Sequence, residues 1–462
     1  MLFSTPFFIF AFLPVFFFLY FTIPARRFVL LIASLLFYAW SEPLFILVIL
    51  ASSLIDWQLG KVIFGDGKWR KFGVILGVTS NVLLLLYAKY TIFAVTNLNQ
   101  LFDIAGWRHL SIPLIALPLG VSFIAFEKIT YLVDLYRRSA TPAHSLVSYL
   151  TYIFLFPKLL AGPIVKYHDI AEQLGSLRLQ YDNIFEGVIR FTKGLAKKLL
   201  IADPLGAYSD QVFNLSVSSL DTPTAWLGIL CFTVQIYFDF SGYSDMAIGL
   251  GRILGFRLLE NFNNPYLATS FTDFWKRWHI SLSSWIKEYV YIPLGGNRVS
   301  KVRSYVNLII CFLLSGLWHG ASWNFIIWGS LHGLALVGDR AFWLRFQKNI
   351  PHSLNVALTF FLIVVTWVFF RCQTFAESMA FLSAMFLPHS ATAHEVFMGA
   401  DVLASLIIGC SLILLPVFRC DKFNLSQPQL RFASMMGVVM LFVLCAGKMS
   451  VSTLHPFLYF RF

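Results

Sequence analysis

The sequence predicts an all-α, multi-pass membrane protein, and three observations lead to this class. Hydrophobic residues make up 58% of the 462 residues, and charged residues only 13%. Soluble domains carry about 25% charged residues, and the mean hydropathy of this chain is high, at +0.73. Apolar segments of about 18 residues or more recur along the whole chain, which is typical of membrane-spanning helices and not of barrel strands with alternating polarity.

The apolar segments, taken in order, predict about eleven spans. The first has no charged residue up to Ala25 and is followed by Arg26 and Arg27, so we expect its amino end outside the cell. It has neither the basic start nor the cleavage site of a signal peptide, and we expect it to be retained. The motif Ser-Glu-Pro at 41–43 divides the second segment. The expected segments are 3–23, 28–56, 73–96, 112–136, 146–161, 222–240, 304–318, 323–338, 354–370, 402–418 and 431–447.

Two regions differ from simple spans. Residues 184–201 have an amphipathic pattern that predicts a helix in the membrane interface with its lysines pointing outward. Residues 241–303 mix glycines, aromatic residues and charges, which predicts short interfacial or re-entrant helices. Irregular backbone at membrane depth is tolerated where it is buried in protein or lines a water-filled cavity, so we expect a cavity there. Without a repeat or a long linker, one domain over 1–462 is expected.

The net charge and the cysteines limit the functional classes. Lysines and arginines in cytoplasmic loops, facing anionic lipid head groups of the bilayer, explain the net charge of +12. A nucleic-acid partner is not expected, because no basic soluble domain is present to bind one. The six cysteines are scattered without CxxC spacing, so neither a disulfide framework nor a metal site is predicted.

Residues 274–298, FWKRWHISLSSWIKEYVYIPLGGNR, form the densest aromatic stretch outside the expected spans and contain His279. An interfacial anchor would account for the aromatic and basic residues. It does not account for the histidine or for the tight turn expected at 295–297. The surplus of basic residues also suits an anionic ligand such as a phosphate-bearing cofactor, and both interpretations stay open. The candidate phosphate contacts are Lys276, Arg277, Lys287 and Arg298.

His319 stands in SGLWHGASWNFIIWGSLHG (315–333), inside an uncharged run from Ser304 to Gly338. Ionisable residues within spans mostly face the protein interior or a water cavity. The small residues around His319 permit close helix packing, but they also leave room for a substrate. A shielded neutral imidazole is the usual general base for a hydroxyl, and a buried structural histidine is the alternative. His332 would point about 220° away on the same helix, which predicts a packing role.

Other charged residues in apolar surroundings have structural interpretations. Glu127 and Lys128 are adjacent within an expected span and could neutralise one another or face a cavity. Asp239 and Asp245 flank Ser-Gly-Tyr at 241–243 and could cap or pin a break in a helix.

The motifs at 274–298 and 315–333 together resemble the membrane-bound O-acyltransferase superfamily, and most of all its bacterial alginate O-acetyltransferase branch. Relatives of that branch act in peptidoglycan and cellulose O-acetylation. Further stretches agree with this resemblance, which is strongest over 1–340: ASLLFYAWSEP, LPLGVSFIAFEKITYLVDLYRR, FPKLLAGPIVKY and QIYFDFSGYSDMAIGLGRILGF.

The resemblance implies a ring of tilted transmembrane helices with short re-entrant and interfacial ones, enclosing a narrow path. It implies that His319 is catalytic and that His279 is the second required polar residue. The resemblance does not identify the oxyanion donor, and the candidates are Ser322, Asn324 or an exposed backbone N–H in the glycine-rich stretch after His319. Residues expected to line the path are Trp278, Ser283, Tyr289, Tyr291, Trp318, Ser322, Trp323 and Asn324.

The implied activity is the movement of an acetyl group from a cytoplasmic thioester, acetyl-CoA, toward an extracytoplasmic polysaccharide. Acetyl-CoA would be a donor substrate, with no bound cofactor. The implied setting is the bacterial inner membrane, with an extracytoplasmic partner resembling a Ser-Gly-Asn-His (SGNH) esterase that completes the transfer. A D-alanyl donor stays open. The rival hypotheses are a transporter or channel with His319 as a proton relay, and a scaffold that only recruits the outer enzyme.

Overall fold

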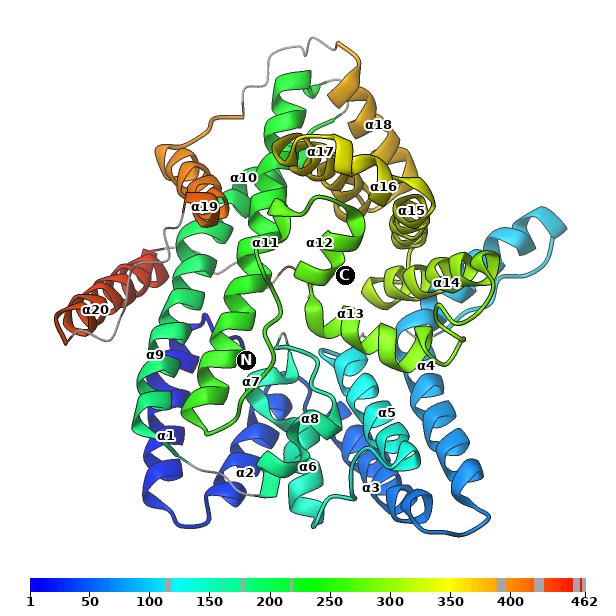
Figure 1. Ribbon diagram of the computed structural model, residues 1–462, viewed down its shortest axis with the longest axis vertical. Helices are drawn as coiled ribbons and strands as arrows, with labels where there is room; N and C mark the ends of the chain where they lie inside the picture. Colours follow the sequence, from blue (N-terminus) through cyan, green and yellow to red (C-terminus); the bar gives the residue numbers. More distant parts are fainter. Residues whose placement is uncertain are drawn as a thin grey trace. The chain divides into compact units, whose positions relative to one another are not determined.

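The structure, a computed structural model, describes residues 1–112, 118–160, 162–175, 179–216, 219–388, 396–418, 428–451 and 458. Every regular element within these residues is a helix, which confirms the all-α prediction (Figure 1). Residues 113–117 of the span expected over 112–136, and residue 161 of that expected over 146–161, lie outside the described residues. The chain divides into two compact units, Met1–Val188 with Ala247–Leu259, and Ile189–Met246 with Glu260–Phe462.

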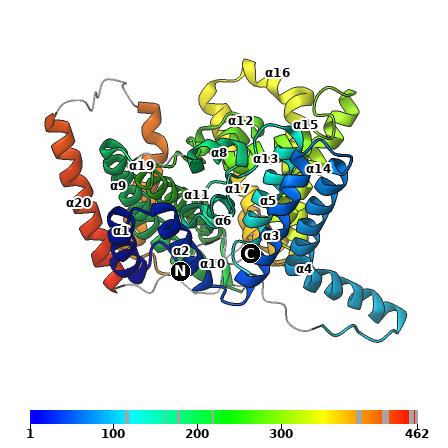
Figure 2. The same ribbon diagram turned by 90° about the horizontal axis from the view of Figure 1, so that it is seen from below.

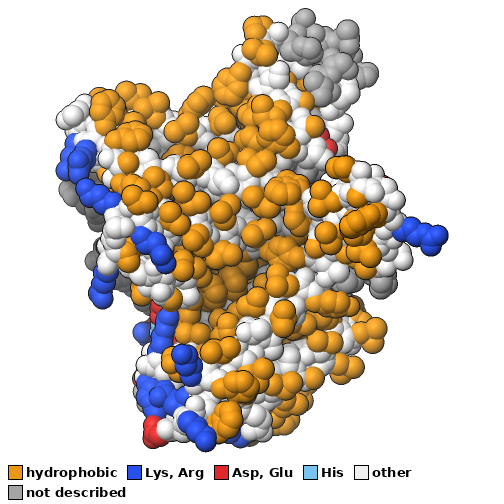
Figure 3. Space-filling view, turned by 90° about the vertical axis from the view of Figure 1, so that its right-hand side faces the viewer, with side chains coloured by type: hydrophobic (Ala, Val, Ile, Leu, Met, Phe, Trp, Pro, Cys, Tyr) orange, Lys and Arg blue, Asp and Glu red, His pale blue; other side chains and the backbone are white. Residues whose placement is uncertain are grey.

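The described helices confirm a multi-pass membrane protein. Six of them are long and apolar enough to cross a membrane: Phe45–Phe64, Arg70–Ala105, Thr222–Ile253, Lys301–His319, His352–Arg371 and Phe432–Val451. Shorter apolar helices cover Phe8–Thr22, Phe375–Phe386 and Ala400–Pro416. Hydrophobic side chains cover most of the face drawn in Figure 3, and Lys and Arg side chains gather mainly along one margin of it. The total of eleven spans stays a prediction.

In the first unit, α5 (Val121–Arg137) is the central helix, because nearly all of its residues are buried. Two long helices, α3 (Phe45–Phe64) and α4 (Arg70–Ala105), pack against it. In α4 no residue after Ala88 is buried, and this second half extends past the ends of α3 and α5 (Figure 2). The other helices of the unit are η1 (Phe8–Phe12), α1 (Leu13–Thr22), α2 (Arg26–Ala39), α6 (Leu146–Phe154), α7 (Phe156–Leu159) and α8 (Tyr167–Gly175).

The break predicted at 41–43 is confirmed, because α2 ends before it and α3 begins after it. The expectation that Glu127 and Lys128 neutralise one another is wrong. The Lys128 Nζ lies 3.0 Å from Asp56 Oδ2, whereas Glu127 forms its ion pair with Lys158. Neighbouring residues on a helix point about 100° apart, so each of these two charges reaches a different helix or segment.

The second unit contains the end of α9 (Tyr181–Ala196), η2 (Lys197–Ala202), α10 (Asp203–Phe213) and most of α11 (Thr222–Ile253). α9 continues directly into the π-helical turn η2, over the region where an outward-facing amphipathic helix is expected. That expectation is wrong for Lys198, whose buried Nζ lies 2.7 Å from Asp203 Oδ1 and 2.8 Å from Asp239 Oδ1.

The helix break expected between Asp239 and Asp245 is also wrong, because α11 runs through both residues without interruption. The two carboxylates form ion pairs instead of helix caps. Asp239 binds Lys198, and Asp245 binds Lys197 and Arg190. Both carboxylates therefore connect α11 to the basic residues of α9 and η2.

The prediction of short helices over 241–303 is wrong for 241–253, which continue the long helix α11, and is confirmed for the residues that follow α11. These short helices are η4 (Pro265–Leu267), α12 (Phe271–Arg277), α13 (Ile280–Ile286) and η5 (Lys287–Tyr291). Ser270 caps α12 by accepting a hydrogen bond from the N–H of Asp273, at 3.1 Å. Ser and Thr side chains at this position commonly end the extended chain and start a helix.

A helical hairpin forms the rest of the unit's core. α14 (Lys301–His319) packs closely on α15 (Trp323–Gly338), and α15 packs on α17 (His352–Arg371). The close approach depends on two glycines, because a Cβ on Gly316 would lie 2.2 Å from the carbonyl oxygen of Phe325 and one on Gly329 would lie 2.4 Å from that of Phe312. Small residues at such crossings let helix backbones meet within membranes. The unit also contains α18 (Phe375–Phe386), α19 (Ala400–Phe418) and α20 (Pro428–Val451).

Candidate active site

His319 is the last residue of α14, where the chain leaves one helix of the hairpin. The next residue, Gly320, is extended, and α15 begins at Trp323. The His319 side chain is buried, with 4% of the residue exposed. The helical-wheel comparison with His332 does not apply, because the two histidines lie on different helices.

Aromatic rings surround the His319 imidazole. The ring centroids of Trp318, Trp328 and Phe370 lie 5.0, 5.1 and 5.2 Å from it, all in edge-to-face arrangements. These rings come from α14, α15 and α17, so three helices together fix the orientation of one side chain. The imidazole is therefore enclosed on several sides by apolar rings.

His279 lies between α12 and α13 in a strained backbone conformation, with φ of 45° and ψ of 53°. Left-handed backbone at a residue other than glycine costs of the order of 1–3 kcal/mol and is concentrated at functional sites. The side chain is fully buried, and its Nδ1 lies 3.2 Å from Oδ1 of Asn261. Burial lowers the pKa of His279 to about 3, so the ring is neutral at physiological pH.

The structure brings the two predicted histidines to the same aromatic side chain. The indole of Trp318 lies 5.0 Å from the His319 ring and 5.8 Å from the His279 ring, measured between centroids. Phe240 of α11 packs edge-to-face on His279 at 4.6 Å. The two sequence motifs, 40 residues apart at their histidines, therefore form one site.

His332 has the position expected for a packing residue. It is fully buried on α15, and its Nδ1 accepts a hydrogen bond from Nε1 of Trp275 at 3.1 Å. Its ring packs against Trp328, with centroids 4.6 Å apart. Since Trp328 also contacts His319, His332 supports the wall behind the His319 imidazole.

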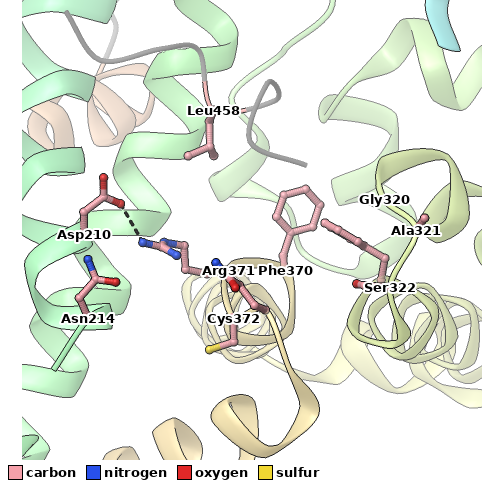
Figure 4. Close-up of a pocket in the computed structure, with 11 residues that line it drawn as sticks. Asp210, Asn214, Gly320, Ala321, Ser322, Phe370, Arg371, Cys372 and Leu458 are labelled. Carbon is pink, nitrogen blue, oxygen red and sulfur yellow. Dashed lines mark hydrogen bonds and ion pairs between the residues drawn. The ribbon is translucent and has the colours of Figure 1, made fainter. Parts of the chain in front are cut away.

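A polar cavity of about 560 Å³ opens beside the break between α14 and α15, and we name it the Arg371 cavity. Figure 4 shows Arg371 reaching from the end of α17 toward Asp210 of α10, with Nη2 2.7 Å from Oδ1. Phe325 and Phe370 add aromatic surface next to these polar groups. The residues of the break that line this cavity are Gly320, Ala321 and Ser322, which directly follow His319.

A second cavity, of about 430 Å³, lies beside His279, and we name it the Asn261 cavity. It is lined by the irregular segment 260–264 together with residues of α9, η2 and α11. This agrees with the cavity that the composition of 241–303 predicts. Asn261 belongs to its wall and binds His279, so the cavity reaches the site from the His279 side.

The lining of the Asn261 cavity has more cationic than anionic side chains. Arg190, Lys193 and Lys197 face two carboxylates, Asp245 and Glu260. Arg190 donates to both carboxylates, at 2.9 Å from Nε to Asp245 Oδ1 and 2.6 Å from Nη1 to Glu260 Oε1, and these partners raise the pKa of its guanidinium. Lys193 is exposed and is the cation that is most accessible to a ligand.

None of the four basic residues expected to contact phosphates lines the Asn261 cavity, although Arg277 donates to the carbonyl of Asn263 in its wall, at 3.4 Å. Arg277 forms an ion pair with Asp273, at 2.8 Å from Nε to Oδ1. Lys276, Lys287 and Arg298 are exposed. Their role in binding an anion stays a prediction, and Arg190, Lys193 and Lys197 join them as candidates. Sequence reasoning missed these three because the amphipathic pattern of 184–201 suggests only a membrane-surface helix.

The residues expected to line the path have different surroundings. Trp278 and Trp318 are buried, and the Trp278 ring packs on Trp367 with centroids 5.2 Å apart. Ser322 lines the Arg371 cavity, whereas Trp323 is 58% exposed. Ser283 is half-buried, and Tyr289 stacks on Trp285. Tyr291 accepts a hydrogen bond from Arg340. The Asn324 amide donates to the carbonyl of Cys372. Their contact with a substrate stays a prediction.

Comparison of the sequence with known proteins identifies relatives of this chain. A sequence model of MBOAT, the membrane-bound O-acyltransferase family, matches residues 137–375, which include His279 and His319. The chain is 42% identical to a protein named probable alginate O-acetylase from Pseudomonas aeruginosa, over 84% of this chain and 75% of the relative. It is 37% identical to the Pseudomonas putida protein of the same name, over the full length of both. It is 39% identical to the peptidoglycan O-acetyltransferase of Helicobacter pylori, over 83% of this chain and 80% of the relative.

These matches cover both histidine motifs and most of the chain. They agree with the resemblance that the sequence motifs show. The chain therefore belongs to the membrane-bound O-acyltransferase family and is an O-acyltransferase.

Proposed function

We propose that this enzyme moves an acetyl group from cytoplasmic acetyl-CoA toward the O-acetylation of an extracytoplasmic polysaccharide, in the inner membrane of a bacterium. The observation that carries the proposal is a buried histidine, His319, at a helix break that lines one polar cavity, with His279 beside a second, positively charged cavity. Relatives named for alginate and for peptidoglycan O-acetylation support a polysaccharide as the final acceptor.

The proposed step begins with an acceptor hydroxyl that enters through the Arg371 cavity. A ring nitrogen of His319 takes the hydroxyl proton while the oxygen attacks the carbonyl carbon of the thioester. The carbon–sulfur bond then breaks, and the coenzyme A thiolate takes the proton from the imidazolium. The products are an acetyl ester and free coenzyme A, and His319 returns to its neutral form.

Of the side chains expected to stabilise the oxyanion, Ser322 is the better candidate. Both amide hydrogens of Asn324 already serve protein acceptors, the carbonyl of Cys372 at 2.8 Å and Oγ of Ser378 at 3.1 Å. Ser322 stands at the N-cap of α15 without a side-chain capping bond, and it lines the Arg371 cavity. A hydroxyl at a helix N-terminus, together with the N–H groups of the first turn, suits developing negative charge.

The Asn261 cavity is the proposed entrance for the donor. Its excess positive charge attracts the phosphates of coenzyme A, and the exposed Lys193 is its most accessible cation. Replacing Lys193 by Ala should raise the KM for acetyl-CoA with little change in kcat, since the lost contact is made equally in the ground state and the transition state. Lys287→Ala tests the sequence-predicted phosphate contacts in the same assay. If Lys287→Ala raises KM and Lys193→Ala does not, the donor enters elsewhere.

A separate extracytoplasmic protein of the SGNH-esterase type is proposed to pass the acetyl group to the polysaccharide. Deleting this partner should leave acetyl-CoA consumption by the purified enzyme intact while surface glycans lose their acetyl groups. Mass spectrometry of the glycans measures this loss and identifies the polysaccharide. Fully acetylated glycans without the partner would contradict its role.

The decisive experiment uses the full chain reconstituted in vesicles with radiolabelled acetyl-CoA outside. Thioester cleavage with transfer of the label to a hydroxyl acceptor supports the enzyme. Accumulation of intact acetyl-CoA inside the vesicles, without cleavage, would support a transporter instead. Acetylation in cells that survives replacement of both His279 and His319 would support a scaffold. Labelled D-alanyl donor in a parallel reaction tests the acyl group.

A further inference from the structure

Asn261 makes three hydrogen-bond contacts at and beside His279 through a single side-chain oxygen. Its Oδ1 lies 3.1 Å from the backbone nitrogen of Ser281, 2.9 Å from Ser281 Oγ and 3.2 Å from His279 Nδ1. The asparagine is buried, with 1% exposed. Three groups on the segment that begins α13 therefore converge on one oxygen atom.

The orientation of the Asn261 amide follows from the backbone. A peptide N–H is always a donor, so the atom that faces the Ser281 nitrogen must be the oxygen and not the NH₂ group. A flipped amide would place two donors against each other in a buried site, which is costly. The Ser281 hydroxyl also lies 3.5 Å from His279 Nδ1, but its single hydrogen goes to the nearer Asn261 oxygen, at 2.9 Å. The Asn261 oxygen can only accept, so the geometry favours His279 Nδ1 as a donor, and a neutral imidazole then has its lone pair on Nε2.

We propose that Asn261 is a positioning residue that holds His279 in the Nδ1–H tautomer, so that Nε2 presents a lone pair to the substrates. This inference rests on the proposed function of the site. It makes His279 an acceptor toward a substrate hydroxyl or amide N–H group. It also means that His279 does not donate to the thioester carbonyl, which leaves oxyanion stabilisation to the break between α14 and α15.

The position of His279 supports this assignment. Its left-handed backbone places the side chain and the N–H of Ser281 on the same side, facing Asn261. Strain of this kind persists where surrounding contacts over-determine the conformation. Burial lowers the pKa of His279 and so keeps its imidazole neutral, with a proton on only one of its two nitrogens. When Nδ1 holds that proton, Nε2 stays unprotonated. Asn261 itself lines the donor-side cavity, which places the arrangement at the entrance of the site.

The test is the ¹⁵N spectrum of histidine-labelled full-length protein, with the His279 signals assigned by their loss in His279→Gln. In the wild type we expect a protonated Nδ1 and an unprotonated Nε2. Asn261→Ala should shift His279 toward the other tautomer, whereas Asn261→Asp, which keeps an acceptor oxygen, should retain the original one. A wild-type tautomer in Asn261→Ala would overturn the inference.

Two further variants separate positioning from general damage. Ser281→Ala removes one hydroxyl but keeps the backbone N–H that orients Asn261, so the tautomer should be unchanged. Asn355→Ala removes another buried asparagine, one that donates to the carbonyls of Gln347 and Ile350, and it should leave the His279 signals unchanged. A tautomer shift in Asn355→Ala as large as that in Asn261→Ala would mean that loss of packing causes the effect.

Transfer of label from acetyl-CoA provides the functional readout. Asn261→Ala should lower kcat by about 10-fold or more, up to the ~10²–10⁴-fold that a positioned acid–base group contributes, with a smaller change in KM. Asn261→Asp should recover most of the loss. If Asn261→Ala changes the tautomer but not the rate, His279 has no part in the reaction, and the proposed role of His279 fails while its positioning by Asn261 stands. If Asn261→Asp is as slow as Asn261→Ala, the positioning inference is refuted.

Discussion

Gly316→Ala is expected to impair catalysis by separating the two helices that hold His319. A Cβ at Gly316 would lie 2.2 Å from the carbonyl oxygen of Phe325 and 3.3 Å from Cα of Gly329. Carbon–oxygen contacts without a covalent bond need about 3.3 Å, so α14 and α15 must move apart by about 1 Å at this point. All three of the nearest atoms belong to the backbone, so no side chain can rotate away to relieve the contact.

The displacement reaches His319, the proposed general base. His319 follows Gly316 by three residues at the end of the same helix, about one turn away. Overpacking of this kind destabilises a fold by about 1–3 kcal/mol. A misplacement of about 1 Å at a reacting group can lower the rate by about 100-fold, so the rate per unit of folded protein should fall in addition to the loss of stability.

The assay compares the rate of label transfer from acetyl-CoA, per unit of folded protein, with thermal unfolding in detergent. Gly338→Ala is the matched control on α15, because its Cβ would make an ordinary contact, 3.6 Å from the Phe342 ring. We expect Gly316→Ala to lose about 100-fold in rate and Gly338→Ala to retain wild-type transfer. Wild-type transfer by Gly316→Ala would refute the claim that the α14–α15 contact positions His319.

Three further outcomes follow from particular contacts. Lys158→Met should lower the free energy of unfolding by about 3–5 kcal/mol, because it leaves Glu127 as an unpaired buried charge. The double variant Lys158→Met with Glu127→Met should lose less stability. Thermal unfolding measures both variants, and a double variant as unstable as the single one would contradict this expectation. Burial lowers the pKa of His279 from 6.5 to about 3, so between these pH values the unfolded chain binds more protons than the folded chain. The free energy of unfolding should therefore decrease as the pH falls below about 6.5. In His279→Gln, the plot of unfolding free energy against pH should have a shallower slope. Arg371→Ala should raise the KM for a hydroxyl acceptor and leave the KM for acetyl-CoA unchanged, since Arg371 and its partner Asp210 line the Arg371 cavity and not the Asn261 cavity. Equal changes in the two KM values would contradict two separate entrances.

The features predicted from the sequence are those that depend on local pattern and composition. Long apolar segments give the membrane class, and the Ser-Glu-Pro motif at 41–43 gives the break before α3. The small residues beside His319 indicate close helix packing, and the structure places Gly316 at such a crossing. The sequence marks His279 and His319 because each is a titratable residue in otherwise apolar or aromatic surroundings.

The features that the sequence did not predict depend on pairing between distant residues. Asn261 lies 18 residues before His279 in an irregular segment, where no periodicity indicates which side chains will meet. Lys198 reaches Asp239, 41 residues away, so its inward direction cannot be read from the amphipathic pattern of its own helix. In both cases the partner is fixed by the packing of separate segments.

The most direct test of the account is the His319→Ala variant, expressed in cells that also contain the proposed extracytoplasmic partner. We expect acetylation of the surface glycan to be abolished, with the variant inserted in the membrane in wild-type amounts and thermal unfolding close to that of the wild type. Mass spectrometry of the glycan measures the acetyl content. A folded and inserted His319→Ala protein that supports wild-type acetylation would contradict His319 as the general base.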